Sequence, residues 1–253
     1  MVSVSVLILA RNEHQNIADC IKSCQSFAQE IIVIDDNSTD DTRDLAEQLG
    51  ARVVVHAMDG DWGAQQTFAI QQAECPWIFF IDADERCTPE LAAAIEKYVN
   101  LDEKIAYCHG RRNLFHFNKA DHGVLRPDKV VRLMPKEGSY VEGRVHPAII
   151  TPYPVKVIPE FIYHYTYDNW QQYFGKFNNY TDLAARKMLE QGKHASVLKD
   201  IVLRPIWAFI KIYFLNGGFL DGRLGWVLSC NHFVYTMMKY ERLYDLEKSN
   251  GKL

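Results

Sequence analysis

Two aspartates follow a strongly apolar run in the first third of the chain. The run Trp77–Ile81 has the unbroken apolar character of a strand buried on both faces, and Asp82 and Asp84 come directly after it. Ligands of open parallel sheets bind outside the carboxyl ends of the strands. Mg²⁺ and Mn²⁺ prefer carboxylate oxygens, so one aspartate can bind such an ion directly while the other holds a water ligand or a ribose hydroxyl. The alternative interpretation is a solvated acidic turn without a ligand.

Two further predicted strands end in polar residues of matching chemistry. After the first strand come Arg11 and Glu13, which can face a base or a diphosphate. After the second come Asp35 and Asp36, whose carboxylates can accept hydrogen bonds from an imide N–H or from ribose hydroxyls. The three strands would place these polar ends on one rim of the sheet. The alternative for the two aspartates is helix capping, although Ser38 can already serve as a cap.

Hydrophobic periodicity indicates the elements that must position these residues. In the first hundred residues, short apolar runs alternate with helix-period segments, which is typical of a parallel sheet covered by helices. The expected strands are Ser3–Leu9, Glu30–Ile34, Arg52–His56 and Trp77–Ile81, and the expected helices begin after Asn16, near Ser38, at Ala64 and at Pro89. We therefore predict an α/β fold class with a Rossmann-like, mostly parallel sheet and flanking helices.

The second half of the chain has a different pattern. Between about residues 106 and 165, apolar runs are separated by glycines and prolines, which predicts an irregular, partly antiparallel extension of short strands. From Trp170 onward, helical spacing dominates. We expect a domain of residues 1–168 with halves 1–105 and 106–168, followed by a helical C-terminal extension of residues 169–253 that associates with a membrane or an oligomer interface.

Length and composition bound the class of protein. With 253 residues, of which 48 % are hydrophobic, the chain can bury a sizeable core. A net charge of −4 provides no basic field for a polyanion, so we expect no nucleic-acid partner. The six cysteines contain no CxxC pair, which favours reduced thiols and a cytoplasmic location. The N-terminus opens directly into a strand without a charged leader, so we expect no export.

The most apolar stretch, Ile201–Leu220, is interrupted by Arg204 and Lys211. A membrane-spanning helix needs about 20 mostly apolar residues, so we predict no span. Two interpretations stay open: a pair of ordinary core helices, and an amphipathic element lying on a membrane. Basic residues interleaved with aromatic ones up to Trp226 support the second, which predicts peripheral contact with the inner face of the cell membrane.

Three segments resemble the motifs of family 2 glycosyltransferases in order and spacing. They are Leu7-Ile-Leu-Ala-Arg-Asn-Glu13, Glu30-Ile-Ile-Val-Ile-Asp35 with Ser38-Thr-Asp-Asp-Thr42, and Asp82-Ala-Asp-Glu85. Within that family the chain is similar to the lipopolysaccharide core β-glucosyltransferase subgroup. The features that carry this similarity are Trp62-Gly63 with Gln66, Arg126-Pro127-Asp128, Arg132-Leu133, Val145-His146 and Gly218-Phe-Leu-Asp-Gly222. The resemblance spans nearly the whole chain and is looser in its second half.

The resemblance implies a GT-A fold and an inverting, metal-dependent hexosyltransferase with a nucleotide-diphosphate donor of the UDP-sugar type. The acceptor it implies is a hydroxyl of a glycan or of a lipid-linked sugar, in the synthesis of lipopolysaccharide or another cell-envelope glycan. Neither the sugar, the linkage, the acceptor nor the oligomeric state can be read from the sequence.

The same resemblance implies roles for individual residues. Those that would surround the uridine are Ala10, Arg11, Glu13 and Asp35. Asp82 would approach the ribose or the metal, and Asp84 would bind the Mn²⁺ or Mg²⁺ ion that neutralises the diphosphate. Of the two histidines that could approach the diphosphate, His146 and His164, we prefer His164 as an additional metal ligand. The alternative for either histidine is a hydrogen-bonded structural role.

Four further residues are expected at the donor or the acceptor. Trp62 and Gln66 would line the donor pocket. Arg126 and Arg132 could grip the diphosphate or a charged acceptor, because guanidinium groups bind such oxygens in pairs. The alternative is that each of the two arginines forms an ion pair at the protein surface.

An inverting transfer also needs a general base near the acceptor hydroxyl. Members of the subgroup often carry a glutamate after the histidine, where this chain has His146 followed by Pro147, so the usual candidate is missing. The nearest carboxylate is Glu142, and Asp128 is the second choice. The alternative for Glu142 is a solvent-facing residue in a turn.

Three other classes of protein are weighed against the transferase. A sugar-1-phosphate nucleotidyltransferase needs a glycine-rich phosphate loop after the first strand, and the segment Leu9–His14 contains no glycine. A nicotinamide-binding dehydrogenase is excluded because G-x-G-x-x-G follows none of the strands. The non-enzymatic alternative is a catalytically degenerate nucleotide-sugar-binding or scaffold protein, and the missing glutamate is its only support.

Overall fold

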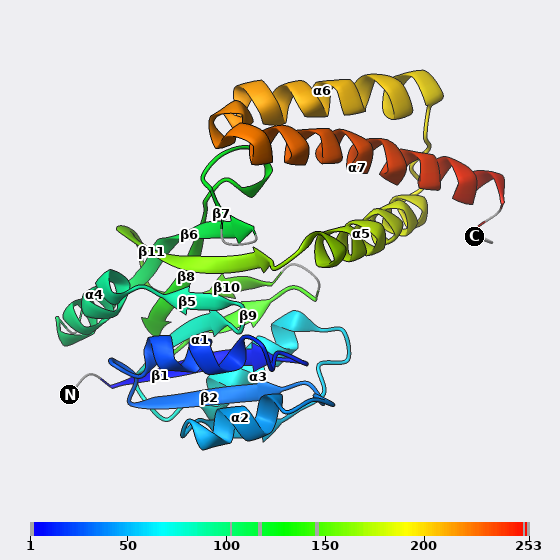
Figure 1. The fold of residues 1–253 in the computed structure, drawn as a ribbon. Coiled ribbons are helices and arrows are strands. Elements are labelled where there is room, and N and C mark those ends of the chain that lie inside the picture. The colour runs from blue at the N-terminus through cyan, green and yellow to red at the C-terminus, as the bar shows by residue number, and fades with distance from the viewer. Residues whose placement is uncertain (1–2, 102, 116–117, 145–146, 250, 252–253) are drawn as a thin grey trace. The chain divides into compact units, whose positions relative to one another are not determined.

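The computed structural model describes residues 3–101, 103–115, 118–144, 147–249 and 251 of the chain (Figure 1). The backbone forms two compact units. Unit 1 comprises Met1–Arg111 and Asp128–His164, and unit 2 comprises Arg112–Pro127 and Tyr165–Leu253. Residues 112–127 therefore group with the C-terminal helices and not with the segments that flank them in sequence.

The first half of the sheet in unit 1 is parallel. In the order β3-β2-β1-β4, its strands are Arg52–Val55, Glu30–Asp35, Val4–Ala10 and Trp77–Asp82. Almost every side chain of β1, β2 and β4 is buried, as the unbroken apolar runs predict for strands covered on both faces. The register pairs Ala10 with Asp35 and Leu9 with Asp82. The carboxyl ends of three strands therefore lie level with one another.

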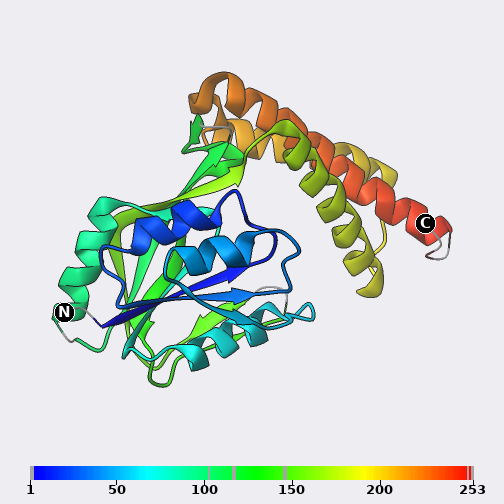
Figure 2. The same cartoon turned by 60° about the horizontal axis from the view of Figure 1, so that its bottom comes forward.

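Helices cover the parallel strands on both faces (Figures 1 and 2). α1 (Ile17–Cys24), α2 (Thr42–Gln48) and α4 (Pro89–Asn100) contribute to the core on one face, and α3 (Trp62–Gln72) contributes to the core on the other. Thr88 caps α4 by accepting a hydrogen bond from the Leu91 N–H, and Pro89 occupies the first turn. All six cysteines are free thiols, as the sequence predicts.

The second half of the sheet is antiparallel and has longer strands than the sequence predicts. Its strands are β8 (Asp128–Pro135), β6 (Ala106–Phe115), β11 (Val155–Tyr167) and β5 (Glu85–Cys87), with β7 (Asn118–Ala120) paired to β6 and a ribbon of β9 (Tyr140–Glu142) and β10 (Ala148–Ile150). The prediction of antiparallel pairing is confirmed. The prediction of short strands is wrong, because β6 continues through Gly110 and β11 through Pro159.

Unit 2 is mainly helical, which confirms the predicted α/β fold class with a helical C-terminal extension. Its elements are η1 (Gly123–Leu125), α5 (Trp170–Glu190), the consecutive η2 (Val197–Leu203), α6 (Arg204–Ile210) and η3 (Lys211–Leu215), then η4 (Gly218–Asp221) and α7 (Gly222–Lys248). α7 packs against α5 and α6 (Figure 1). In the part of the chain that the structure describes, no helix is long and apolar enough to cross a membrane.

A close approach of two backbones fixes α3 against β9 in unit 1. A Cβ atom on Gly63 would lie 2.8 Å from the Gly143 carbonyl oxygen. Beside it, the Trp62 N–H donates to the Arg144 carbonyl at 3.0 Å, and Thr67 Oγ1 accepts the Val141 N–H at 3.0 Å. Only glycine fits between the first turn of α3 and the end of β9 without a backbone shift.

We expect Gly63→Ala to destabilise the protein by about 1–3 kcal/mol, because the added methyl group overpacks a backbone contact. The measurement is the urea unfolding midpoint. Gly175→Ala in α5 is the matched control, since nothing lies within 4 Å of its added Cβ. This control should be neutral or gain about 0.5–1 kcal/mol of helix propensity. A Gly63→Ala protein as stable as the wild type would contradict the proposed close contact.

Candidate active site

A cavity of about 880 Å³ opens at the carboxyl ends of β1 and β4 in unit 1. The residues predicted from sequence that line it are Ala10, Arg11, Glu13, Trp62, Gln66, Asp82, Asp84, Arg132 and His164. They come from β1 and β4 or the loops after these strands, from α3, and from the antiparallel strands β8 and β11. The sheet therefore brings together most of the residues that the motifs single out.

The loops after β1 and β2 brace each other at one side of the cavity. Asn12 donates its backbone N–H to Ser38 Oγ at 2.9 Å, and its side-chain oxygen accepts the Thr39 N–H at 2.8 Å. Asn12 and Asn37 have φ angles of 56° and 54°, a left-handed conformation in which asparagine is enriched. Because Ser38 and Thr39 are engaged in this brace, α2 begins only at Thr42, later than the sequence suggests.

Of the two carboxylates after β2, Asp36 and not Asp35 lines the cavity. Asp35 is fully buried and accepts the Ser38 N–H at 2.9 Å, so it holds the loop. Asp36 accepts the Met58 N–H at 3.0 Å and forms an ion pair with Arg11, also at 3.0 Å. The two neighbours differ because successive side chains of an extended chain point to opposite faces.

α3 supplies one wall of the cavity. Trp62 and Gln66 lie one turn apart and both line it, together with the buried Gln65. The Gln65 amide donates to the His56 carbonyl at 2.8 Å, which fixes the helix against the end of β3. The Trp62 side chain is 45 % exposed, so its ring can stack on a ligand at the mouth of the cavity.

A buried cluster of charges lies beneath Asp82. Arg132 donates to Asp82 Oδ2 at 2.5 Å and lies 3.3 Å from Glu85 Oε1. Glu85 accepts the Asp82 backbone N–H at 2.9 Å and also lies 3.4 Å from the Arg111 guanidinium. Glu85 is fully buried and Arg132 nearly so. The glutamate therefore fixes both the backbone and, through Arg132, the carboxylate of Asp82.

The charges in this cluster shift one another's proton affinity. Burial raises the pKa of Glu85 to about 7, against the lowering effect of the Arg132 charge. Burial alone would lower the pKa of Arg132, but the carboxylates of Asp82 and Glu85 raise it well above its ordinary value. Arg132 therefore stays charged, and it neutralises much of the charge of Asp82.

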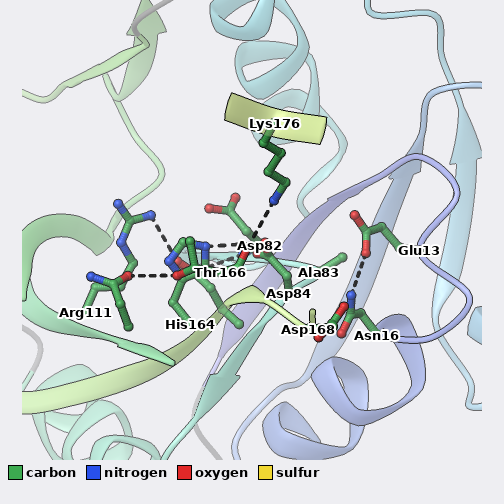
Figure 3. A network of polar contacts seen from close by, with 12 residues as sticks. Glu13, Asn16, Asp82, Ala83, Asp84, Arg111, His164, Thr166, Asp168 and Lys176 are labelled. Atoms are coloured by element: carbon green, nitrogen blue, oxygen red, sulfur yellow. Dashed lines mark hydrogen bonds and ion pairs between the residues drawn. The ribbon is translucent and has the colours of Figure 1, made fainter. Parts of the chain in front are cut away.

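Asp84 and His164 form a separate pair at the cavity wall (Figure 3). His164 Nε2 lies 3.4 Å from Asp84 Oδ2, because β11 pairs with β5 in a register that sets His164 opposite Glu85. Two ligand atoms that are each about 2.1 Å from one cation lie about 3.0–3.4 Å apart when the angle between them is near a right angle or tetrahedral. The spacing of these two atoms fits a shared divalent cation.

Within the described residues, His14, Asp40 and Asp41 are the one group of three potential ligands close enough to share an ion. They lie at the protein surface, and Asp40 is already occupied by hydrogen bonds from His14 and Thr42. None of the three lines the cavity. Asp40 accepts the Thr42 N–H at 3.1 Å and so stabilises the turn that leads into α2.

The structure places neither predicted general base in the cavity wall. Asp128 forms two hydrogen bonds with Arg111, at 2.9 and 2.6 Å. Partial burial raises its pKa, but these bonds and the Arg111 charge outweigh that effect and lower it. Glu142 is exposed on β9 and pairs in register with Ala148, which does line the cavity. Paired residues share a face of a ribbon, so Glu142 lies at the rim.

Arg126, expected at the diphosphate or the acceptor, does not line the cavity. Arg126 belongs to unit 2 and is exposed. His146 lies outside the described residues.

Three charged residues at the site, Glu85, Arg111 and Lys129, were not assigned by sequence reasoning. Glu85 belongs to the motif Asp82-Ala-Asp-Glu85, so the sequence places it near the site. Its burial between two arginines could not be predicted, because a run of acidic residues normally lies at the protein surface. Arg111 and Lys129 line the cavity from β6 and β8. No pattern in the sequence distinguishes them from other basic residues, because their position depends on antiparallel pairing between distant segments.

Comparison with known proteins agrees with this geometry. A family model described as glycosyl transferase family 2 matches residues 5–122. An uncharacterized glycosyltransferase of Rickettsia felis is 32 % identical to the chain, over 98 % of this chain and 91 % of the relative. The chain belongs to glycosyl transferase family 2. A second relative of this family 2 chain is the lipopolysaccharide core biosynthesis glycosyltransferase LpsC of Rhizobium meliloti, 29 % identical over 96 % of this chain and 92 % of the relative. The predicted resemblance is confirmed.

Among solved structures, this family 2 chain has a weaker likeness to glucosyl-3-phosphoglycerate synthase from Mycobacterium tuberculosis, crystallised with Mn²⁺, UDP and glucosyl-3-phosphoglycerate. The match is 25 % identical, covers 45 % of this chain and 44 % of that chain, and has a TM-score of 0.37. At that score the likeness supports no statement about ligands of this chain.

We expect Arg132→Met to destabilise the protein by about 3–5 kcal/mol at pH 8, because it removes the main cation beside a buried carboxylate. The loss should be smaller at pH 5. Glu85, whose pKa is raised in the folded protein, can take up a proton there and avoid the burial of an unpaired charge. The measurement is urea unfolding at both pH values.

The control for this substitution is Arg126→Met, at an exposed arginine of the same chain, which should change stability by less than about 0.5 kcal/mol. An equal loss for Arg132→Met at pH 5 and pH 8 would show that the buried charge of Glu85 does not determine its effect.

Proposed function

We propose that this glycosyltransferase moves a sugar from a UDP-sugar, bound with a divalent cation, to a hydroxyl of a lipid-linked or lipopolysaccharide-core glycan, with inversion. The observation that carries the proposal is the pair Asp84 and His164 at 3.4 Å, beside an Asp82 already neutralised by Arg132, in one wall of the cavity. Such a wall suits a ligand that brings both a cation and phosphate oxygens.

The nucleoside end of the donor is assigned to the braced loops after β1 and β2. Arg11 and Asp36 are paired across the two loops, and Ala10 and Glu13 line the same part of the cavity. Asp36 can accept hydrogen bonds from an imide or from ribose hydroxyls, and it takes the place beside the uridine that the family resemblance implies for Asp35. Asp35 supports this contact from below by holding the backbone that follows it.

The diphosphate is assigned to the wall of the cavity that carries Asp84 and His164. Asp84 and His164 would hold the cation, which neutralises the negative charge that develops on the departing UDP. Asp82, oriented by Arg132 and Glu85, would accept a ribose hydroxyl or a water molecule of the cation. Trp62 and Gln66 would contact the sugar from the α3 wall. Mn²⁺ and Mg²⁺ both suit carboxylate ligands, and the histidine favours the softer Mn²⁺.

The general base is assigned to Glu142 at the rim. A base must be deprotonated and must be free to accept the proton of the acceptor hydroxyl. The pKa of Asp128 is lowered and its two oxygens are held by Arg111, so it is a weak base. Glu142 is exposed and lies opposite Ala148, which lines the cavity, so an acceptor hydroxyl at the rim could reach it.

The acceptor is assigned from the similarity of the chain to a relative and from the side chains exposed on unit 2. LpsC, which matches the chain over nearly its whole length, is named for lipopolysaccharide core biosynthesis. A lipid-linked acceptor would be met at the inner face of the cell membrane, and unit 2 exposes many apolar side chains. Peripheral contact with that membrane is therefore part of the proposal.

We expect Asp84→Asn to abolish the stabilisation of the protein by UDP with Mn²⁺, because the amide is a poorer cation ligand than the carboxylate. The measurement is the melting temperature with Mn²⁺, Mg²⁺ or EDTA, each with UDP. Asp128→Asn is the matched control and should keep the metal-dependent shift. If the wild type shows no shift with any nucleotide and no donor hydrolysis with metal, the degenerate scaffold becomes the better interpretation.

We expect Glu142→Gln to reduce kcat for transfer by about 10²–10⁴ while leaving the binding of UDP with Mn²⁺ intact, because only the proton acceptor is removed. The measurement combines steady-state kinetics with calorimetric titration of UDP. Asp128→Asn should lose less activity than Glu142→Gln. The reverse order would move the base to Asp128.

A further inference from the structure

A row of large apolar side chains is exposed along unit 2. We call it the apolar edge and define it by Leu198, Trp207, Phe214, Leu215, Leu220 and Trp226, each at least half exposed. They come from η2, α6, η3, η4 and the first turns of α7. The elements η2, α6, η3 and η4 also pack on α7. Ring contacts of Tyr213 with Phe214 and with Trp226 join two of these side chains, and exposed apolar surface of this kind marks an interaction site.

The turn that carries Leu220 is held rigidly. A Cβ on Gly225 would lie 1.8 Å from the Gly218 carbonyl oxygen, so η4 rests directly on the backbone of α7. Asp221 accepts hydrogen bonds from the His122 N–H at 3.1 Å and from its ring at 3.0 Å. Leu220 is therefore exposed to solvent on a well-packed turn and not on the loose end of a helix.

The charges around the apolar edge are basic. Residues 199–226 contain four basic residues, Lys199, Arg204, Lys211 and Arg223, and two acidic ones, Asp200 and Asp221, in a chain whose net charge is −4. Asp200 is buried and paired with Arg204, and Asp221 is partly buried and paired with His122. The basic residues are exposed. The edge therefore presents positive charge to its surroundings.

A small cavity adjoins one end of the edge. It has a volume of about 300 Å³, and its polar lining comprises Asn118, Lys119, Asp221 and Arg223, with Trp170 among the apolar residues. Arg223 lies one helical turn before Trp226 of the edge, so the two side chains share a face of α7. The volume and the two cations suit a phosphate group attached to a lipid.

We propose that the apolar edge docks on an anionic lipid bilayer, with its aromatic side chains in the interfacial layer and with Arg223 and Lys119 at lipid phosphates. Tryptophans flanked by basic residues are typical of segments that lie in that layer. A second copy of the chain fits less well, since it would bring the same positive charges face to face. This inference rests on the proposed function, in which the acceptor is linked to a membrane lipid. The binding of the apolar edge to a bilayer can nevertheless be measured without that acceptor.

The test is co-sedimentation of the full chain with vesicles of phosphatidylcholine alone or with 30 % phosphatidylglycerol. We expect binding to the anionic vesicles, and a decrease of about tenfold or more for Trp207→Ser and for Leu220→Ser. Leu101→Ser is the matched control, because this exposed leucine at the end of α4 belongs to unit 1. It should bind as the wild type does.

The charges are tested separately. Lys211→Ala and Arg223→Ala should each weaken binding to anionic vesicles about fivefold, and 0.5 M NaCl should have a similar effect on the wild type. Neither change should affect the weak binding to neutral vesicles.

Two results would overturn the inference. One is wild-type protein that stays in the supernatant with anionic vesicles at low salt. The other is a set of edge variants that bind as the wild type does or that change only the oligomeric state in light scattering, which would assign the edge to a second copy. Donor hydrolysis in the absence of vesicles reports the proposed function independently, and the edge variants should leave it unchanged.

Discussion

The buried contact between Glu85, Arg132 and Asp82 is the constraint on which the site depends. The Glu85 carboxylate and the Arg132 guanidinium are withdrawn from water beneath the partly exposed Asp82, and buried charges of this kind are stable only when each has its partner. Glu85 is a short distance along the chain from Asp82, whereas Arg132 arrives from an antiparallel strand. The contact therefore joins the two halves of the sheet in unit 1 and fixes Asp82, leaving the neighbouring Asp84 to face His164 across the β5–β11 pairing.

The parallel half of the sheet was predictable because its signal is local. Apolar runs of strand length separated by helix-period segments specify β1 to β4, and the polar residues that follow each run then fall on one rim. The antiparallel half was less predictable, because β6 and β11 contain Gly110 and Pro159, which usually interrupt strands. Their pairing is decided by contacts between distant segments. For the same reason Arg111 and Lys129 could not be assigned to the cavity, although both line it.

Within the site, residue type was predictable and side-chain direction was not. Asp35 and Asp36 are chemically equivalent in a sequence, but one extended step turns the first into the core and the second toward the cavity. The start of α2 was misplaced because Ser38 and Thr39, good capping residues, are bonded to Asn12 instead. In unit 2, the reason for glycine at position 218 is seen only in the structure, where the backbones of Gly218 and Gly225 leave no room for a side chain.

The Mn²⁺ ion is expected between Asp84 and His164, next to the diphosphate of UDP. Anomalous diffraction from a crystal of the protein soaked with Mn²⁺ and UDP tests this expectation most directly. A single strong manganese peak between Asp84 and His164, with the diphosphate on the side of Arg132, is the result that the account predicts. A peak at His14, Asp40 and Asp41, or UDP bound without any peak near Asp84, would contradict it.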